Sequence, residues 1–186
     1  MIGVRQAEIQ DNKLLAEIGA ETFYGSFAVD NTPEDIAAYL SASFNPAKQG
    51  TELADSQSRF LIAEINNEAV GYTHLRFSAV PRAVAGQKPI EIARFYVRKP
   101  WIGKGVGAHL MRGCLQEARA AGCDVIWLGV WEKNLRAIAF YRNWGFSKVG
   151  DQTFQLGNDL QQDLLMTRPL SIDEHDLVFG DKSSQL

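Results

Sequence analysis

Three glycines alternate with other residues in the segment Gly103-Lys104-Gly105-Val106-Gly107-Ala108, which opens an expected helix. Glycine permits backbone conformations that turn successive N–H groups toward one point, and the first N–H groups of a helix lack intrahelical partners. Both features suit a phosphate group, and Lys104 adds a positive charge. A P-loop and a dinucleotide fingerprint need other glycine spacings. The segment therefore predicts an anion-binding loop of another kind, and the alternative is a turn that only packs a helix on a strand.

A second candidate group lies further along the chain. Asn134 precedes an expected helix, and Tyr141 lies on the apolar side of that helix. An Asn in this position commonly caps the helix, and a Tyr on an apolar face is commonly a core residue whose hydroxyl finds a partner. Spacing alone favours these two roles, although a capping Asn134 could also contact a ligand.

Hydrophobic periodicity indicates the elements that position these residues. Apolar side chains recur at helical spacing over 105–121 and 135–144, and Thr32-Pro33-Glu34-Asp35 has the residue types of a helix start. Strand patterns occupy 60–65, 69–77, 90–97, 125–130, 147–154 and 163–167. This order predicts an α/β fold with a mixed sheet and helices on both faces.

Composition limits the class of protein. The chain has 186 residues, of which 46% are hydrophobic and 22% charged, as expected for one globular domain. No apolar run is long enough for a membrane span and no signal layout begins the chain, so we expect a cytoplasmic protein without a membrane partner. Cys114, Cys123 and three scattered histidines predict neither a disulfide framework nor a metal site.

The net charge of −3 is unevenly distributed. Residues 94–148 carry a net +7, whereas residues 1–93 and 149–186 each carry −5. A negative total argues against a nucleic-acid partner. The basic middle predicts an anionic ligand near the centre of the chain and leaves room for a cationic one nearby, and the alternative is a solvated basic face.

The order and spacing of these motifs resemble those of the GNAT N-acetyltransferase superfamily. The resemblance is carried by Phe95-Tyr96-Val97, the glycine segment 103–108, and Asn134 with Ala137, Phe140, Tyr141, Gly145 and Phe146. Two further stretches resemble the bacterial polyamine (spermidine/spermine) N-acetyltransferase branch. They are 127–134 and an early stretch with Thr22-Phe23, 31–35 and Tyr39-Leu40. The resemblance implies a single domain over 1–170, followed by an acidic tail over 171–186 that we expect to be mobile or partner-dependent.

The resemblance also implies a fold and a co-substrate. Members have a mostly antiparallel sheet of about six to seven strands with helices on both faces and a splay between two central parallel strands. Backbone groups of Phe95, Tyr96 and Val97 would then hold the pantetheine arm of acetyl-CoA. The N–H groups of residues 103–108 (Gly103, Lys104, Gly105, Val106, Gly107, Ala108) would hold its pyrophosphate. Asn134 would contact the arm from the other side, and Tyr141 would lie near the thioester sulfur.

Two positions depart from the family pattern. Ile102 stands where relatives usually have Arg or Gln, so a side-chain contact to the pyrophosphate is lost while the main-chain donors remain. Ala93 stands where the polyamine branch often has Glu, and Glu91 lies on the same strand face one pleat earlier. Glu91 is therefore the candidate base, with a solvated strand-end carboxylate as its alternative role.

The implied reaction is direct transfer of an acetyl group to a primary amine, with a polyamine favoured. Such an amine has a pKa near 10 and must lose a proton, the thioester oxygen needs a donor such as the Val97 N–H, and the departing thiolate needs a proton from Tyr141. Glu21, Asp30, Glu34 and Asp35 are candidate attractors for a polycation, with helix capping and solubility as their alternative roles, which the helix-start pattern favours for Glu34 and Asp35. Alternatives are a protein N-terminus or an aminoglycoside-type amine as acceptor, or a non-catalytic acyl-CoA-binding module. Homodimers are common among relatives.

Overall fold

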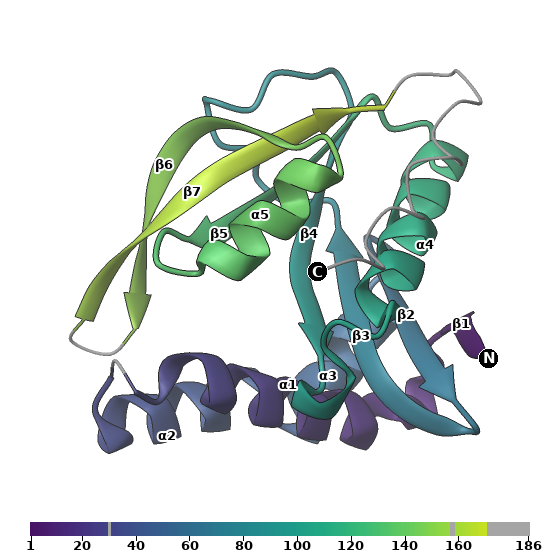
Figure 1. The fold of residues 1–186 in the computed structure, drawn as a ribbon, viewed down its shortest axis with the longest axis vertical. Coiled ribbons are helices and arrows are strands. Elements are labelled where there is room, and N and C mark those ends of the chain that lie inside the picture. Colours follow the sequence, from purple (N-terminus) through teal and green to yellow (C-terminus); the bar gives the residue numbers. More distant parts are fainter. Residues whose placement is uncertain (30, 157–158, 171–186) are drawn as a thin grey trace.

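The computed structural model describes residues 1–29, 31–156 and 159–170. Its strands form one seven-stranded sheet in the order β1-β2-β3-β4-β5-β7-β6. Neighbouring strands are antiparallel except β4 and β5, which are parallel. Figure 1 shows the β5–β7 half of the sheet diverging from the β1–β4 half. The mixed, mostly antiparallel α/β fold with two parallel central strands is confirmed.

The bounds of the elements follow the sequence pattern closely. The strands are β1 (Ile2–Gln6), β2 (Ser58–Ile65), β3 (Glu68–Arg76), β4 (Pro89–Val97), β5 (Val125–Trp131), β6 (Ser147–Leu156) and β7 (Asp159–Pro169). The α-helices are α1 (Asn12–Phe27), α2 (Pro33–Ser43), α3 (Pro46–Ala54), α4 (Val106–Ala120) and α5 (Leu135–Asn143), with short 3₁₀ turns η1 (Ile9–Asp11) and η2 (Lys99–Trp101). The last two strands are longer than the pattern predicted.

Local chemistry explains where several elements begin. Thr32 caps α2, because its side chain accepts a hydrogen bond from the Asp35 N–H at 3.2 Å and Pro33 fills the first helical position. The turn between β2 and β3 places Asn66 and Asn67 at φ 51° and 65°, the left-handed region that asparagine tolerates better than most residues.

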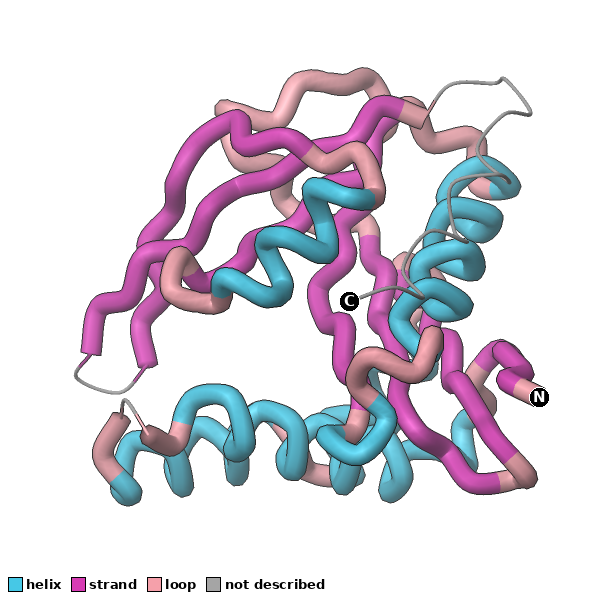
Figure 2. The backbone as a smooth tube through the Cα atoms, in the orientation of Figure 1, coloured by secondary structure: helices cyan, strands magenta, loops and turns pink. Residues whose placement is uncertain are grey.

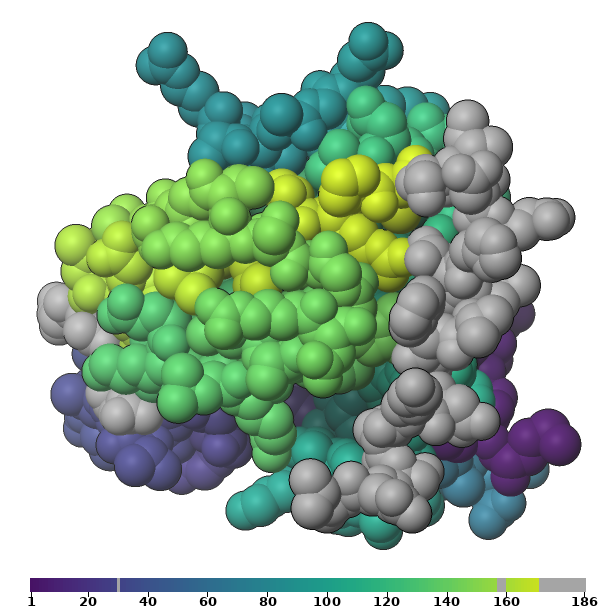
Figure 3. All heavy atoms as spheres, turned by 45° about the horizontal axis from the view of Figure 1, so that its top comes forward, coloured from purple at the N-terminus to yellow at the C-terminus, as the bar shows by residue number. Residues whose placement is uncertain are grey.

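The helices form a layer on each face of the sheet. In Figure 2, the helices α1, α2 and α3 lie together on one face of the sheet, toward one end of it, and α4 and α5 lie on the opposite face. The main core lies under α4 and α5, and a second core lies between α1 and the β2–β3 hairpin. Figure 3 shows α5 and the β6–β7 hairpin, green to yellow, as one continuous surface. The sheet is thus buried on both sides, as an α/β fold requires.

The ladder between β4 and β5 is short. It contains only the pairs Pro89↔Val125, Ile90↔Ile126 and Glu91↔Trp127, although both strands continue beyond it. A β-bulge where β3 pairs with β4, between His74 and Leu75, bends β4 just after this point. The predicted splay between the central parallel strands is therefore present, and it begins after Glu91.

Some sequence predictions fall outside the described residues. These are Asp30 and the acidic tail 171–186. Within the described part of the chain, no helix has the length and apolar character to cross a membrane.

Candidate active site

Backbone groups of β4 point into the splay. The Arg98 N–H donates to the Val70 carbonyl at 2.9 Å, which identifies this pair as hydrogen-bonded in the β3–β4 ladder. Because antiparallel pairing repeats every two residues, Tyr96 also directs its N–H and C=O toward β3. Phe95 and Val97 consequently direct theirs toward β5, which has already diverged. Of the three residues predicted to offer backbone groups, two face the gap and Tyr96 does not.

The glycine segment forms the turn into α4, close to the end of β4. Gly103 and Gly105 have φ values of 79° and 85°, a conformation that other residues adopt only with strain, and Gly105 is the N-cap of α4. Val106, Gly107 and Ala108 follow as the first helical residues, whose N–H groups have no intrahelical acceptor. The loop thus presents free donors at the positive end of the helix dipole, and these fit a pyrophosphate.

The backbone of one residue of this loop, Lys104, has a different part from the one that the family resemblance implies. The Lys104 N–H donates to the Trp101 carbonyl at 3.3 Å, so its backbone is used by the turn. Its ammonium lies 5.0 Å from the centroid of the Trp101 ring, at an exposed position. Lys104 therefore contributes its side-chain charge, and the neighbouring Ile102 contributes none.

Tyr141 lies on the α4/α5 side of the sheet beside the gap. Its ring makes edge contacts with Phe95, Phe140 and Phe146, at centroid distances of 6.1, 5.5 and 5.7 Å. Burial raises the pKa of its hydroxyl well above the usual value, so the phenol keeps its proton at neutral pH. No described residue hydrogen-bonds that hydroxyl. The side chain is both a core aromatic and an available proton donor.

Asn134 caps α5, as its position before a helix predicts. Its side-chain oxygen accepts a hydrogen bond from the Ala137 N–H at 3.1 Å. The residue is only half-buried, so the cap leaves its amide nitrogen available for a second contact. Its contact with a ligand stays a prediction.

Glu91 is fully engaged by its neighbours. One oxygen accepts from Arg76 Nε at 2.7 Å and Ser78 Oγ at 2.6 Å, and the other from Arg76 Nη2 at 3.2 Å. The residue is 9% exposed. A carboxylate held by a bidentate guanidinium is a poor proton acceptor. These contacts favour a structural role at the last β4–β5 pair over the predicted catalytic role.

A different carboxylate lies over β5, the strand that borders the splay, and sequence reasoning missed it. Asp163 of β7 stands opposite Trp131 of β5, on the face that carries α1 and α2. Its oxygen lies 3.3 Å from where a Cβ on Gly129 would be, and Gln152 of β6 hydrogen-bonds it. Burial raises its pKa to about 6. The available signal was Gly129, because a glycine inside an apolar strand often marks a close approach by another group.

The acidic residues of the N-terminal half serve mainly as structural partners. Glu17 and Glu21 flank Arg98, at 2.5 and 3.3 Å from its guanidinium. Glu52 holds Arg94 with contacts of 2.5 and 3.0 Å. These pairs also neutralise two charges of the basic middle segment. The predicted attraction of a polycation by Glu21 thus lacks a free carboxylate.

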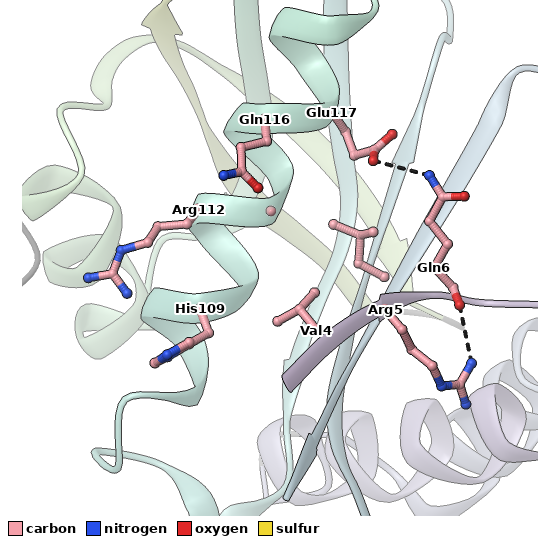
Figure 4. A pocket seen from close by; sticks show the side chains of 9 residues that line it. Val4, Arg5, Gln6, His109, Arg112, Gln116 and Glu117 are labelled. Carbon is pink, nitrogen blue, oxygen red and sulfur yellow. Dashed lines mark hydrogen bonds between the residues drawn. The ribbon is translucent and has the colours of Figure 1, made fainter. Parts of the chain in front are cut away.

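A surface cavity of about 310 Å³ lies on the far side of α4, between this helix and β1. Figure 4 shows Gln6 bonded to Glu117 across it, with His109 and Arg112 along α4. Its lining includes no residue of β4, β5 or α5. The cavity is therefore separate from the splay.

Comparison with known proteins agrees with this geometry. The model of the acetyltransferase (GNAT) family matches residues 20–146. The chain belongs to this family. An uncharacterized N-acetyltransferase from the pepI 3' region of Lactobacillus delbrueckii subsp. lactis is 33% identical to this GNAT chain over 172 residues, covering 91% of it and 99% of the relative. The chain is accordingly an acetyltransferase.

Solved structures share the fold. PaiA N-acetyltransferase of Thermoplasma acidophilum, crystallised with coenzyme A, superposes with a TM-score of 0.71 at 20% identity, covering 91% of this GNAT chain and 99% of that structure. The predicted GNAT fold is confirmed.

Two relatives with named substrates match less of the chain. Spermine/spermidine N(1)-acetyltransferase of Bacillus subtilis is 32% identical over 62 residues, covering 33% of this GNAT chain and 41% of the relative. Streptothricin acetyltransferase of Streptomyces lavendulae is 29% identical over 128 residues, covering 67% of this chain and 65% of the relative. Both partial matches leave the acceptor open.

Proposed function

We propose that this protein transfers the acetyl group of acetyl-CoA to a primary amine of a small molecule, with a polyamine as the favoured acceptor. The observation that carries the proposal is the end of the β4–β5 ladder at Glu91↔Trp127. Beyond it, β4 and β5 no longer pair, so backbone groups of the two strands are left without a ladder partner in the described part of the chain, with Tyr141 on one face of the sheet and Asp163 on the other. A thioester placed in this splay would be reached by a proton donor and an acceptor amine from opposite sides.

The residues around the splay fit the parts of acetyl-CoA. The N–H groups at the start of α4 suit its pyrophosphate, and Lys104 adds charge at the rim. The backbone groups of Phe95 and Val97 suit the amides of the pantetheine arm, since they lack strand partners on that side. Asn134 would contact the arm from α5.

The chain's own groups meet the chemical demands of the transfer. Acetyl-CoA supplies the acetyl thioester. The Val97 N–H would donate to the thioester oxygen as charge develops there, and the Tyr141 hydroxyl would protonate the departing sulfur. Cys114 is fully buried with its pKa raised to about 12, so it offers no thiolate nucleophile. This supports direct attack by the amine.

Thiol release from acetyl-CoA across a panel of amines tests the proposal. The panel contains spermidine, an aminoglycoside and a peptide with a free N-terminus, and product mass identifies the acetylated nitrogen. Turnover that is fastest with spermidine supports the proposal, and preference for another amine refutes the polyamine assignment. Binding of acetyl-CoA without turnover on any amine would instead support a regulatory acyl-CoA-binding module.

A further inference from the structure

We propose that Asp163 receives the ammonium group of the acceptor and removes its proton before acetyl transfer. This inference rests on the proposed function. It assigns the role of general base to Asp163, because Arg76 and Ser78 already hold the carboxylate of Glu91.

The position of Asp163 depends on Gly129. A Cβ at Gly129 would lie 2.6 Å from Gln152 Nε2 and 3.3 Å from Asp163 Oδ2, so the missing side chain makes room for this pair. Gly129 is two residues beyond Trp127, the last residue of β5 that pairs with β4. The carboxylate therefore covers the part of β5 that borders the splay.

Asp163 and Tyr141 lie on opposite faces of the sheet. Tyr141 packs in the core with Leu128 and Val130 of β5, whose side chains face α4 and α5. Gly129 lies between these two residues, so the groups over it are on the other face. A thioester threaded through the splay would thus have a proton donor on one side and a proton acceptor on the other.

Aromatic rings lie on the same face of the sheet as the Asp163 carboxylate. Phe27 of α1 lies 5.2 Å from Trp131, the residue opposite Asp163, and Tyr39 of α2 lies 5.7 Å from Phe154 of β6. All four rings are partly exposed. A single carboxylate among aromatic rings suits an alkylammonium ion, through ion pairing and cation–π attraction.

The charges around Asp163 leave it able to exchange a proton near neutral pH. Burial raises its pKa to about 6, and the hydrogen bond from Gln152 opposes that rise. Among the described residues of the helical layer, Tyr39 is the titratable group that interacts electrostatically with it, and the raised pKa of Tyr39, due mainly to burial, keeps that side chain neutral. β5 and β6 present Gly129, Trp131, Gln152 and Phe154 to it, none of which titrates.

Two cations share this face at the far side of the splay. Arg94 of β4 is paired with Glu52, and Arg76 of β3 is paired with Glu91. Both guanidinium groups are thus compensated locally. Among the described residues of β3 to β7 on this face, Asp163 is the carboxylate without an ion pair.

The proposed step balances in protons and electrons. Asp163 takes one proton from R–NH₃⁺, and the freed nitrogen lone pair attacks the thioester carbonyl carbon to form the C–N bond. The C–S bond then breaks, and its electron pair stays on sulfur, which takes the hydroxyl proton of Tyr141. The second proton of the nitrogen returns to Tyr141 through solvent and restores the phenol. The products are the acetamide, free thiol and protonated Asp163, which releases its proton to solvent.

The pH dependence of Asp163→Asn tests this step. Wild-type kcat/KM for the best amine of the panel should be level between pH of about 6, where Asp163 ionises, and about 10, where the amine does. Without a proton acceptor, only the neutral amine reacts, so the variant's kcat/KM should rise about tenfold per pH unit over this range and be about 10²-fold lower or more at pH 7. Asp151→Asn, an exposed carboxylate paired with Lys148 on β6, is the matched control and should keep the wild-type profile.

Two further measurements guard against a misfolded variant. Gly129→Ala keeps the carboxylate but displaces it, and should lower kcat/KM at least about tenfold without moving the melting temperature of the folded protein by more than a few degrees. The ¹³C shift of the Asp163 carboxyl, assigned by its loss in Asp163→Asn, should titrate near 6 in the free protein.

The outcomes separate the two proposals. A wild-type protein that turns over no amine overturns the proposed function and this inference with it. If the wild type turns over an amine and the pH profile of kcat/KM in Asp163→Asn runs parallel to that of the wild type, the role of Asp163 alone is overturned, whatever the KM of the variant. A carboxyl titration at the ordinary value near 4 would contradict it as well.

Discussion

Removal of the Tyr141 hydroxyl should separate catalysis from folding in this protein. Tyr141→Phe keeps the ring, which packs against Phe95, Phe140 and Phe146. No described residue hydrogen-bonds the hydroxyl, so no buried partner is left unsatisfied by its loss. We therefore expect the free energy of unfolding to change by less than about 1 kcal/mol.

The effect on turnover should be far larger. A positioned general acid contributes about 10²- to 10⁴-fold, and water reaching the sulfur can replace part of it. We expect kcat to fall at least about tenfold, equivalent to about 1.4 kcal/mol in the activation barrier. The dissociation constant of acetyl-CoA should change less than about twofold, because the proposed site of the phosphates is at the start of α4 instead.

The assay compares kcat from thiol release with acetyl-CoA affinity from calorimetry. Tyr72→Phe is the matched control, because Tyr72 is also buried and packs in the other core, beside α1. Its kcat should stay within about twofold of wild type. An unchanged kcat in Tyr141→Phe would refute the role of Tyr141 as proton donor.

Three other substitutions probe the frame of the site. Glu52→Gln leaves the largely buried Arg94 without its carboxylate and should lower the free energy of unfolding, measured by urea titration, by about 3–5 kcal/mol. The control Lys48→Gln removes the exposed amine that also contacts Glu52 and should lower it by under about 1 kcal/mol. Gly105→Ala places a side chain on a residue with φ 85°, so it should lower the free energy of unfolding by about 1–2 kcal/mol and raise the KM for acetyl-CoA. The control Gly25→Ala adds a methyl group in open space on α1 and should not lower the free energy of unfolding. Burial lowers the pKa of His74 to about 2, below its unfolded value near 6.5. Between these two pH values the unfolded chain binds one proton more than the folded chain. The free energy of unfolding therefore falls as the pH drops below about 6.5. His74→Gln should remove up to about 1.4 kcal/mol of this pH-dependent loss of stability per pH unit. The variant is compared with wild type at each pH, so that the opposite contribution of Asp163, present in both proteins, cancels. Parallel curves of stability against pH for the two proteins would contradict the prediction.

Local elements of this fold could be predicted because their signals are local. Thr32 and Pro33 start α2, and the glycines at 103 and 105 turn the chain into α4, through contacts within a few residues. The same locality explains why the anion-binding loop and the cap at Asn134 were recognisable in the sequence. The extended ends of β6 and β7 were underpredicted because they are stabilised by pairing with each other, which a residue pattern does not show.

Which carboxylate can act as a base could not be predicted from the local sequence. Glu91 and Asp163 look equivalent in the sequence, as single carboxylates in strands. Their difference arises from neighbours distant along the chain: Arg76 and Ser78 engage Glu91, while Gly129 and Gln152 leave Asp163 over β5, the strand that borders the splay.

The sequence by itself indicated the family through the order and spacing of its motifs. Through that resemblance it also predicted a glycine loop that suits a pyrophosphate and Tyr141 of α5 as the proton donor. The tertiary structure decided which backbone groups of β4 face the splay, which acids of the N-terminal half are already paired, and which carboxylate stands across the sheet from Tyr141. The physical reason is that strand register and ion pairing join residues far apart in the chain, and a proton acceptor is defined by those surroundings.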